Sequence, residues 1–207
     1  MFNNVNILSL TVSLIKKEKF FKKIYISTDD DKIKRIAKKL DLEIIHREKR
    51  LSGDFTSTID VIKNSIKIIN IKDKLNYICC IYPCNPFLNM SDVRKCYKIV
   101  KKNQNFVFPV VKYSHPIQRA FTLSKSGKIK PANKNSSNKR TQDLVDYYHD
   151  AGQFYYGNVK CWLNSDSIHL NAKGLPLPSY RVVDIDNVED WKRAEKLHLI
   201  LNEKKNK

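Results

Sequence analysis

Short apolar segments alternate with longer amphipathic segments through the first half of the chain. The short segments are bounded by turn-forming residues and predict β-strands over residues 23–27, 43–46, 77–81 and 106–111. Between them, apolar residues recur every three or four positions and predict helices over residues 33–40, 56–70 and 91–103. Strands separated by helices pair in parallel through right-handed crossovers, so this order predicts the α/β class.

The pattern changes after residue 115. Residues 115–150 mix short strand signals with a polar run at 133–138, which predicts an excursion from the sheet rather than a second core. Strand character returns at 153–157 and at 180–183, and Asn187 is placed to cap a closing helix. A chain of 207 residues suits one domain of this kind, so we expect a single domain over residues 1–207.

The segment ahead of the first predicted strand fits two structures. Apolar residues at 8, 10, 12 and 14 alternate with polar ones, as in a strand, but a helix with one apolar face can be drawn equally well. Local pattern leaves both open.

Charge and cysteine content limit the class of protein. The net charge is +18, but the lysines are scattered along helical faces instead of forming one stripe with interleaved aromatic residues, so we expect no nucleic-acid partner. No apolar run is long enough to cross a membrane, and we expect no membrane partner. Five cysteines without CxxC spacing disfavour a disulfide framework or a zinc site and suit a cytoplasmic protein.

Polar residues that follow the predicted strands are candidates for chemistry, because ligands of open α/β sheets bind beyond the carboxyl ends of the strands. Asp184 and Asp186 stand two residues apart in an extended segment, so their carboxylates can point the same way and share a divalent cation; a turn with a helix cap is the alternative. Phosphate loops rich in glycine are absent. His115 and His149 could be acid–base groups or structural histidines.

Taken together, the segments resemble the acylneuraminate cytidylyltransferase family, which joins CMP to sialic acids and related nonulosonic acids. The matching segments are IYISTDD (24–30), REKRLSGDFTSTIDVI (47–62), YPCNPFL (82–88), YSHPIQRA (113–120), RTQDLVDYYHDAGQFYYG (140–157) and VVDIDNVEDW (182–191). The segments HPIQRA and YHDAGQFYYG are the more selective ones and are similar to the branch that acts on pseudaminic acid.

This resemblance implies a Rossmann-like nucleotidyltransferase fold with a mainly parallel sheet. It also implies that CTP and pseudaminic acid yield the CMP-sugar and pyrophosphate, with Mg2+ as cofactor. Residues 113–152 then form an excursion that makes a homodimer and part of the sugar site. Legionaminic or sialic acid is the alternative substrate, although Tyr82 stands where sialic acid enzymes usually have Gln. The alternative of another class is a non-catalytic remnant that binds a sugar or a partner.

The resemblance also assigns roles to individual residues. Asp184 and Asp186 match the magnesium-binding acids. Residues that match positions near the nucleotide are Arg47, Asp54, Thr58 and Asn85. Residues that fall in the sugar-pocket region are His115, Gln118, Arg119, Arg140, Gln142, His149 and Gln153, with Arg140 suited to a bidentate pair with the sugar carboxylate.

One feature departs from the family. Its members begin with a strand and a triphosphate-binding loop of Ala-Arg-Gly-Gly-Ser-Lys type, whereas residues 1–4 resemble the stretch just after that loop. On this comparison we expect a sheet that lacks its first strand, a helix at residues 5–21, and weak or absent turnover by the chain as given.

Overall fold

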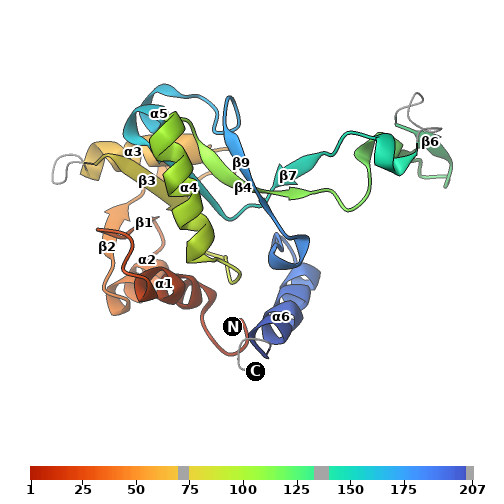
Figure 1. Cartoon of the computed structure of the whole chain (residues 1–207). Helices are drawn as coiled ribbons and strands as arrows, with labels where there is room; N and C mark the ends of the chain where they lie inside the picture. The colour runs from red at the N-terminus through yellow and green to blue at the C-terminus, as the bar shows by residue number, and fades with distance from the viewer. Residues whose placement is uncertain (70–74, 133–139, 204–207) are drawn as a thin grey trace.

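The structure is a computed structural model, and it describes residues 1–69, 75–132 and 140–203 (Figure 1). The elements follow in this order: α1 (Ile7–Lys17), β1 (Tyr25–Thr28), α2 (Asp31–Lys39), β2 (Glu43–His46), the 3-10 turn η1 (Lys49–Leu51), α3 (Thr58–Ile69), β3 (Tyr77–Ile81), α4 (Met90–Asn103), β4 (Val107–Lys112), η2 (Ile117–Arg119), β5 (Phe121–Leu123), β6 (Ile129–Pro131), η4 (Thr141–Asp143), β7 (Tyr148–Asp150), β8 (Phe154–Asn158), α5 (Val159–Asn164), β9 (Lys173–Leu177), η5 (Ser179–Arg181) and α6 (Val188–Glu203).

The main sheet has five strands. Its order is β3-β8-β4-β7, and β9 pairs in parallel with β4. Strand β8 is antiparallel to both β3 and β4, so these two run in the same direction as β9, while β7 and β8 run the opposite way. Strands β1 and β2 form a separate parallel pair. Within the described residues no ladder joins this pair to the main sheet, and the expected lack of a first strand stays a prediction.

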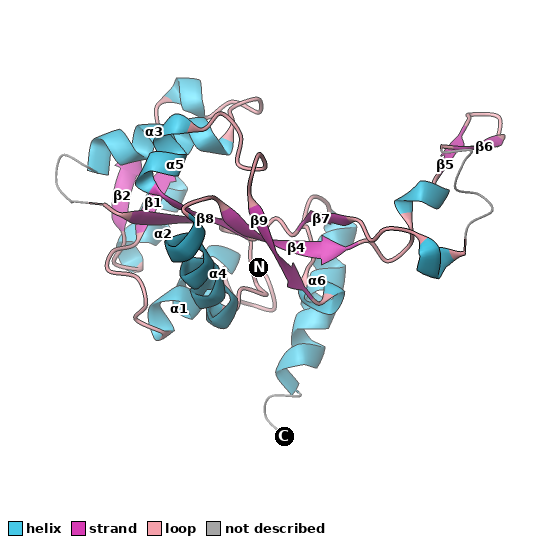
Figure 2. Cartoon of the chain, turned by 45° about the horizontal axis from the view of Figure 1, so that its top comes forward, coloured by secondary structure: helices cyan, strands magenta, loops and turns pink. Residues whose placement is uncertain are grey.

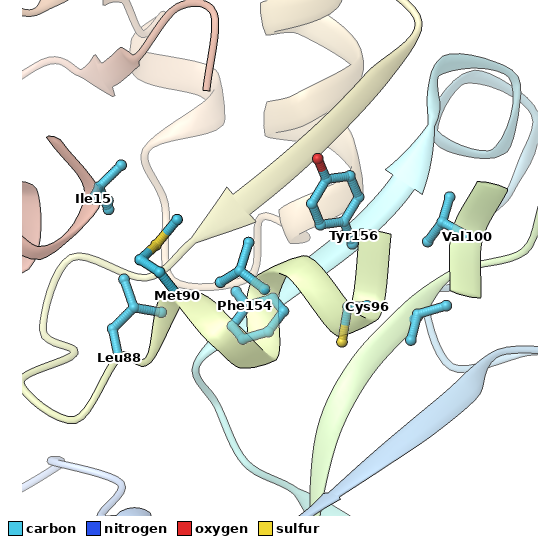
Figure 3. Packing of buried hydrophobic residues seen from close by; sticks show 9 residues of the cluster. Ile15, Leu88, Met90, Cys96, Val100, Phe154 and Tyr156 are labelled. Atoms are coloured by element: carbon cyan, nitrogen blue, oxygen red, sulfur yellow. The ribbon is translucent and has the colours of Figure 1, made fainter. Parts of the chain in front are cut away.

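Helices cover both faces of the main sheet (Figure 2). On one face α1 and α4 pack against β8 and β4, and Figure 3 shows side chains of this cluster, among them Ile15, Cys96, Phe154 and Tyr156. On the other face α3 and α5 enclose a second cluster that includes the fully buried Trp162. Alternate side chains of β3 enter the two clusters, so this strand is covered on both faces as its continuous apolar pattern predicts.

Side-chain caps fix the ends of several helices. Asp30 accepts from the backbone N–H groups of the first turn of α2. Asn187 does the same for α6, and this cap is the one that the sequence predicts. The first segment is a helix, α1, capped by Asn6. Its residues Leu8, Val12 and Ile15 are buried, which decides between the two structures left open by the local pattern.

The prediction of a strand at residues 180–183 is wrong. The structure has the turn η5 there, and the strand lies earlier, at β9. The sequence of β9 carries Gly174 and Pro176, which break a strand pattern, and β9 sits beside β4 at an edge of the sheet, where proline is tolerated. Gly174 is required by packing, because a Cβ atom there would lie 2.8 Å from Cγ2 of Val110.

Residues 113–132 and 140–147 form an arm that leaves the sheet after β4 and returns at β7 (Figure 1). At its far end β5 and β6 form a two-stranded antiparallel hairpin. The polar run predicted at 133–138 lies outside the described residues. Strand β7 itself belongs to the main sheet, so the structure places only part of the expected excursion 113–152 away from the body. Among the described helices, none is long and apolar enough to span a membrane.

Candidate active site

The two candidate metal-binding acids lie in the extended segment 182–187 between η5 and α6. Val183 and Ile185 pack against the cluster around Phe2 and α6. Because side chains alternate along an extended backbone, Asp184 and Asp186 fall on the opposite, exposed side. The two-residue spacing of Asp184 and Asp186 therefore corresponds to two side chains on one exposed side of the segment.

Negative charge gathers around Asp184. Partial burial raises the pKa of its carboxyl, and the charges of Asp186, Asp150 and Asp190 raise it further. A neighbouring His149 acts in the opposite direction. A divalent cation between the acids would relieve this repulsion, so the electrostatics fit a metal ion.

The donor set fits magnesium more closely than a transition metal. The described residues contain no group of three or more His, Cys, Asp or Glu side chains arranged to hold an ion. Two carboxylates are enough for Mg2+, which commonly completes its coordination with water and substrate phosphates. Asp184 and Asp186 match that requirement.

Asp150 organises the neighbouring turn. One carboxylate oxygen accepts from the N–H of Gly152 at 2.8 Å, and the other accepts from the hydroxyl of Tyr155 at 2.9 Å and lies 2.9 Å from Nε2 of His169. Gly152 has a φ of +62°, and a Cβ atom built on it would lie 3.4 Å from Oδ1 of Asp184. The turn 150–152 is thus held directly against the acid segment.

Asn85 and Gln153 are both buried and are bonded to each other. The amide of Asn85 donates to the carbonyl oxygen of Gln153 at 3.1 Å, and the side chain of Gln153 donates to the carbonyl oxygen of Arg181 at 3.0 Å. The N–H of Asn85 also donates to Thr11 of α1, at 3.3 Å. These hydrogen bonds link Asn85, which is assigned to the nucleotide, with Gln153, which is assigned to the sugar. They also link Gln153 with Arg181, at the start of the acid segment.

The other residues assigned to the nucleotide lie around β1 and α3. Arg47 donates to the carbonyl oxygen of Ser27 at 2.7 Å, at the end of β1. The hydroxyl of Thr58, in the first turn of α3, lies 2.9 Å from that of Tyr82. Asp54 is exposed in the loop between them. All three residues follow β2, and Arg47 and Thr58 contact the end of β1 and the residue after β3, as expected for the carboxyl-end edge of an α/β fold.

Most residues assigned to the sugar pocket lie on or near the arm. Gln118 donates to the carbonyl oxygen of Val145 at 2.7 Å, and its own side-chain oxygen is buried without a partner. Arg119 lies 3.4 Å from the hydroxyl of Thr141. Arg140 and Gln142 are exposed at the turn η4. The hydrogen bonds of Gln118 and Arg119 both end on other residues of the arm.

The two histidines have different surroundings. His149 is on β7, where its ring contacts that of Tyr113 and its Nδ1 lies 2.8 Å from the carbonyl oxygen of Asp150. His115 is exposed and lies 3.1 Å from the hydroxyl of Ser114. Of the two, only His149 influences the pKa of Asp184.

A surface hollow of about 520 Å³ is lined by residues of η1, of α3 and of the loop between them. Arg50, Lys63 and Lys67 line it together with Phe55. None of the residues assigned to nucleotide, sugar or metal lines this hollow, but Gly53 and Phe55, on either side of Asp54, do.

Comparison with known proteins decides the family. A family model described as Cytidylyltransferase matches residues 1–203. The chain belongs to this family. It is 33% identical over 187 residues to the pseudaminic acid cytidylyltransferase of Campylobacter jejuni. This alignment covers 88% of this chain and 81% of that protein. It is 25% identical over 174 residues to N-acylneuraminate cytidylyltransferase B of Danio rerio, with 83% of this chain and 40% of that protein covered.

A solved structure supports the fold of this cytidylyltransferase. The structure of CMP:2-keto-3-deoxy-manno-octonic acid synthetase complexed with CTP matches with a TM-score of 0.66 at 10% sequence identity. The match covers 95% of this chain and 88% of the synthetase. The predicted Rossmann-like α/β nucleotidyltransferase fold is confirmed, with β7 and β8 as the antiparallel strands.

Three residues of this site were not assigned a role from the sequence. They are Asp150, which accepts a hydrogen bond from Gly152, and the pair of Arg181 and Asp92, which are hydrogen-bonded to each other. Asp150 adjoins His149 in a segment that was singled out, so its neighbourhood was a usable signal. From the sequence, Asp92 is an ordinary acidic residue in the first turn of a helix, and no local sequence pattern connects it with Arg181.

Proposed function

We propose that this cytidylyltransferase transfers CMP from CTP to pseudaminic acid and releases pyrophosphate. The observation that carries the proposal is the similarity to the Campylobacter jejuni enzyme named for this sugar, which extends over 88% of the chain. The structure adds physical support. Turn 150–152 lies against Asp184, and hydrogen bonds connect Asn85 with Gln153 and Gln153 with Arg181, so acidic and amide groups are gathered at one place.

The reaction is an in-line attack of the anomeric hydroxyl of the sugar on the α-phosphorus of CTP, with pyrophosphate leaving. Asp184 and Asp186 would hold Mg2+, and the bound ion would neutralise the charge that develops on the phosphate oxygens. Thr58, Arg47 and Asn85 would hold the nucleotide in position. Fixing the two substrates in line contributes through proximity and orientation.

The sugar carboxylate is assigned to Arg140. This residue is exposed on the arm, and the apolar side chains of the arm, Phe121, Leu123, Ile129 and Val145, are exposed as well. Apolar side chains exposed together are typical of an association surface. The arm therefore pairs two copies in a homodimer and carries Arg140 of one copy to the acid segment of the other.

The cytoplasm is the compartment that fits this activity, because it supplies CTP and keeps thiols reduced. Burial raises the pKa of the Cys80 and Cys96 thiols to about 12, so these cysteines are protonated and unreactive at neutral pH. The proposal includes no nucleic-acid partner. Binding to duplex DNA at low salt, with a steep loss on adding salt, would contradict this part of it.

The test is product formation from CTP and each of three sugars. The chain is incubated with CTP, Mg2+ and pseudaminic, legionaminic or sialic acid, and the CMP-sugar is measured by mass spectrometry together with released pyrophosphate. The enzyme is used near the substrate concentration over several hours, so that slow product formation is also detected. CMP-pseudaminic acid as the main product supports the proposal. A preference for another sugar, or sugar binding with no CTP consumed, contradicts it.

A further inference from the structure

Arg181 is fixed at both its backbone and its side chain, immediately ahead of the acid segment. Its guanidinium Nη2 donates to Oδ2 of Asp92 at 2.5 Å. Its carbonyl oxygen accepts from the side chain of Gln153 at 3.0 Å. Asp184 follows three residues later along an extended backbone.

Asp92 is an unusual partner, because it is a carboxylate with a side chain that is only 5% exposed. It lies in the first turn of α4, the helix that follows the loop carrying Asn85. Its other oxygen lies 3.4 Å from Lys95, which is 62% exposed and therefore a weak partner. Arg181 is thus the principal countercharge of a buried acid.

Besides these bonds, the start of the acid segment is held by apolar packing and by a turn hydrogen bond of 3.1 Å from the N–H of Val182 to the carbonyl oxygen of Ser179. Residues 182–187 belong to no helix or strand. Val182 packs on the cluster of Val111, Ala151 and Leu177, and Val183 on the opposite cluster around Phe2. These apolar contacts are non-directional, whereas the charged hydrogen bond from Arg181 to Asp92 fixes a position along the helix.

We propose that Asp92 and Arg181 are positioning residues that set the place of Asp184 and Asp186 relative to Asn85 and Gln153. The pair touches neither nucleotide nor sugar in this account. It acts by tying the acid segment to the helix behind the Asn85 loop. The inference rests on the proposed function of Asp184 and Asp186 as magnesium-binding acids.

The experiment measures metal binding directly instead of turnover. Mn2+ serves as the probe, and its binding to the chain in the presence of CTP is followed by electron paramagnetic resonance. Asp92→Asn keeps the shape of the side chain and removes its charge, and Arg181→Lys keeps the charge and removes the planar donor group. Lys95→Ala is the matched control, because it removes the exposed partner of the same carboxylate.

The expected result is an apparent Kd for Mn2+ that rises about tenfold in Asp92→Asn and in Arg181→Lys, as for other changes that disturb the orientation of metal ligands. Lys95→Ala should bind Mn2+ as the wild type does. In Asp92→Asn and Arg181→Lys, CTP binding without metal should change less than Mn2+ binding, which a general loss of structure would not reproduce. Arg181→Lys supplies the result if Asp92→Asn does not fold.

Two outcomes overturn the inference and are distinguishable. If the wild-type chain with CTP binds no Mn2+, the assignment of Asp184 and Asp186 fails and this inference fails with it. If the wild type binds Mn2+ and both folded variants bind it equally well, the proposed metal site stands and the positioning role is wrong.

Discussion

The side-chain amide of Asn85 donates a hydrogen bond of 3.1 Å to the carbonyl oxygen of Gln153, which also accepts from the N–H of Tyr82 at 3.0 Å. Asn85 is 3% exposed and Gln153 is 5% exposed, so the bond is shielded from water. It connects the loop after β3 with the start of β8. A local change at either residue should therefore affect both stability and substrate binding.

Asn85→Ala is predicted to lower the free energy of unfolding by about 1–3 kcal/mol, because it removes a buried hydrogen bond. Asn85→Asp should destabilise the chain more, since it places a carboxylate against a carbonyl oxygen without water. Urea unfolding measures both. Cys84→Ser, at the exposed neighbouring position, is the control and should leave stability near that of the wild type. An Asn85→Ala variant as stable as this control would contradict the role of the bond.

Asp184→Asn is predicted to be at least as stable as the wild type at pH 7 when divalent cations are removed. The pKa of Asp184 is raised by partial burial and then by neighbouring acids. A carboxyl with a raised pKa in the folded chain contributes stability at low pH and loses it as the pH rises through that pKa. Neutralising Asp184 removes this loss, and for an exposed group the gain in Tm should be small, about 1–2 °C.

The measurement is Tm between pH 4.5 and 7.5 in EDTA and then in Mg2+. The advantage of Asp184→Asn in EDTA should shrink as the pH falls. Mg2+ with CTP should raise the Tm of the wild type and not that of the variant, because a ligand stabilises only the form that binds it. A clear loss of stability in the variant at pH 7 in EDTA would show that the acid is not under repulsion.

Leu123→Asp is predicted to convert a dimer into a monomer. Leu123 is 72% exposed on β5, beside other exposed apolar residues of the arm, and a charge there would have to be buried in the interface. Sedimentation velocity gives the oligomeric state. Ser126→Asp, at the turn of the same hairpin, is the control and should remain dimeric. A wild-type chain that sediments as a monomer would contradict the assignment of the arm.

Mixing two inactive variants tests whether the site is shared between copies. Arg140→Ala and Asp184→Asn should each be nearly inactive alone. After random exchange of subunits in equal amounts, half of the dimers hold one variant of each kind and one intact site, so about a quarter of wild-type activity should return. No recovery despite proven subunit exchange would place Arg140 outside the site to which Asp184 belongs.

Gly174→Ala is predicted to destabilise the fold by about 1–3 kcal/mol, because the added Cβ atom would overlap Val110. Val110→Ala in the same chain should recover part of this loss by removing the overlapping methyl groups. Gly53→Ala is the control, since the nearest atom to its Cβ would lie 3.9 Å away. Urea unfolding of the two single variants and the double variant completes the cycle.

Local pattern predicted the elements whose signal is complete within their own residues. Strands β2 and β3 lie where the apolar segments placed them, and Asn187 caps α6 as its residue type suggests. Strand β9 was missed because its place depends on β4, with Pro176 and Gly174 tolerated only through that neighbour. The segment assigned as a strand instead, 180–183, is apolar in part because Val182 and Val183 pack into two clusters.

The candidate site likewise combines features that the local sequence predicts with features that depend on residues far apart in the chain. The common side of Asp184 and Asp186 follows from alternation along an extended chain. The pair of Arg181 and Asp92 joins residues 89 positions apart, and no local rule connects them. The approach of turn 150–152 to Asp184 likewise arises from the pairing of β7 and β4 and from packing of the segment after η5.

The most direct test of the account is the rate of CMP-pseudaminic acid formation in Asp184→Asn compared with Glu189→Gln. Both changes neutralise an exposed acid near the start of α6, but only Asp184 is assigned to the metal. We predict that Asp184→Asn loses about 100-fold or more of the rate, as expected when charge stabilisation in phosphoryl transfer is removed, while Glu189→Gln stays within about threefold of the wild type. A product rate in Asp184→Asn equal to that in Glu189→Gln would contradict the assignment of the active site.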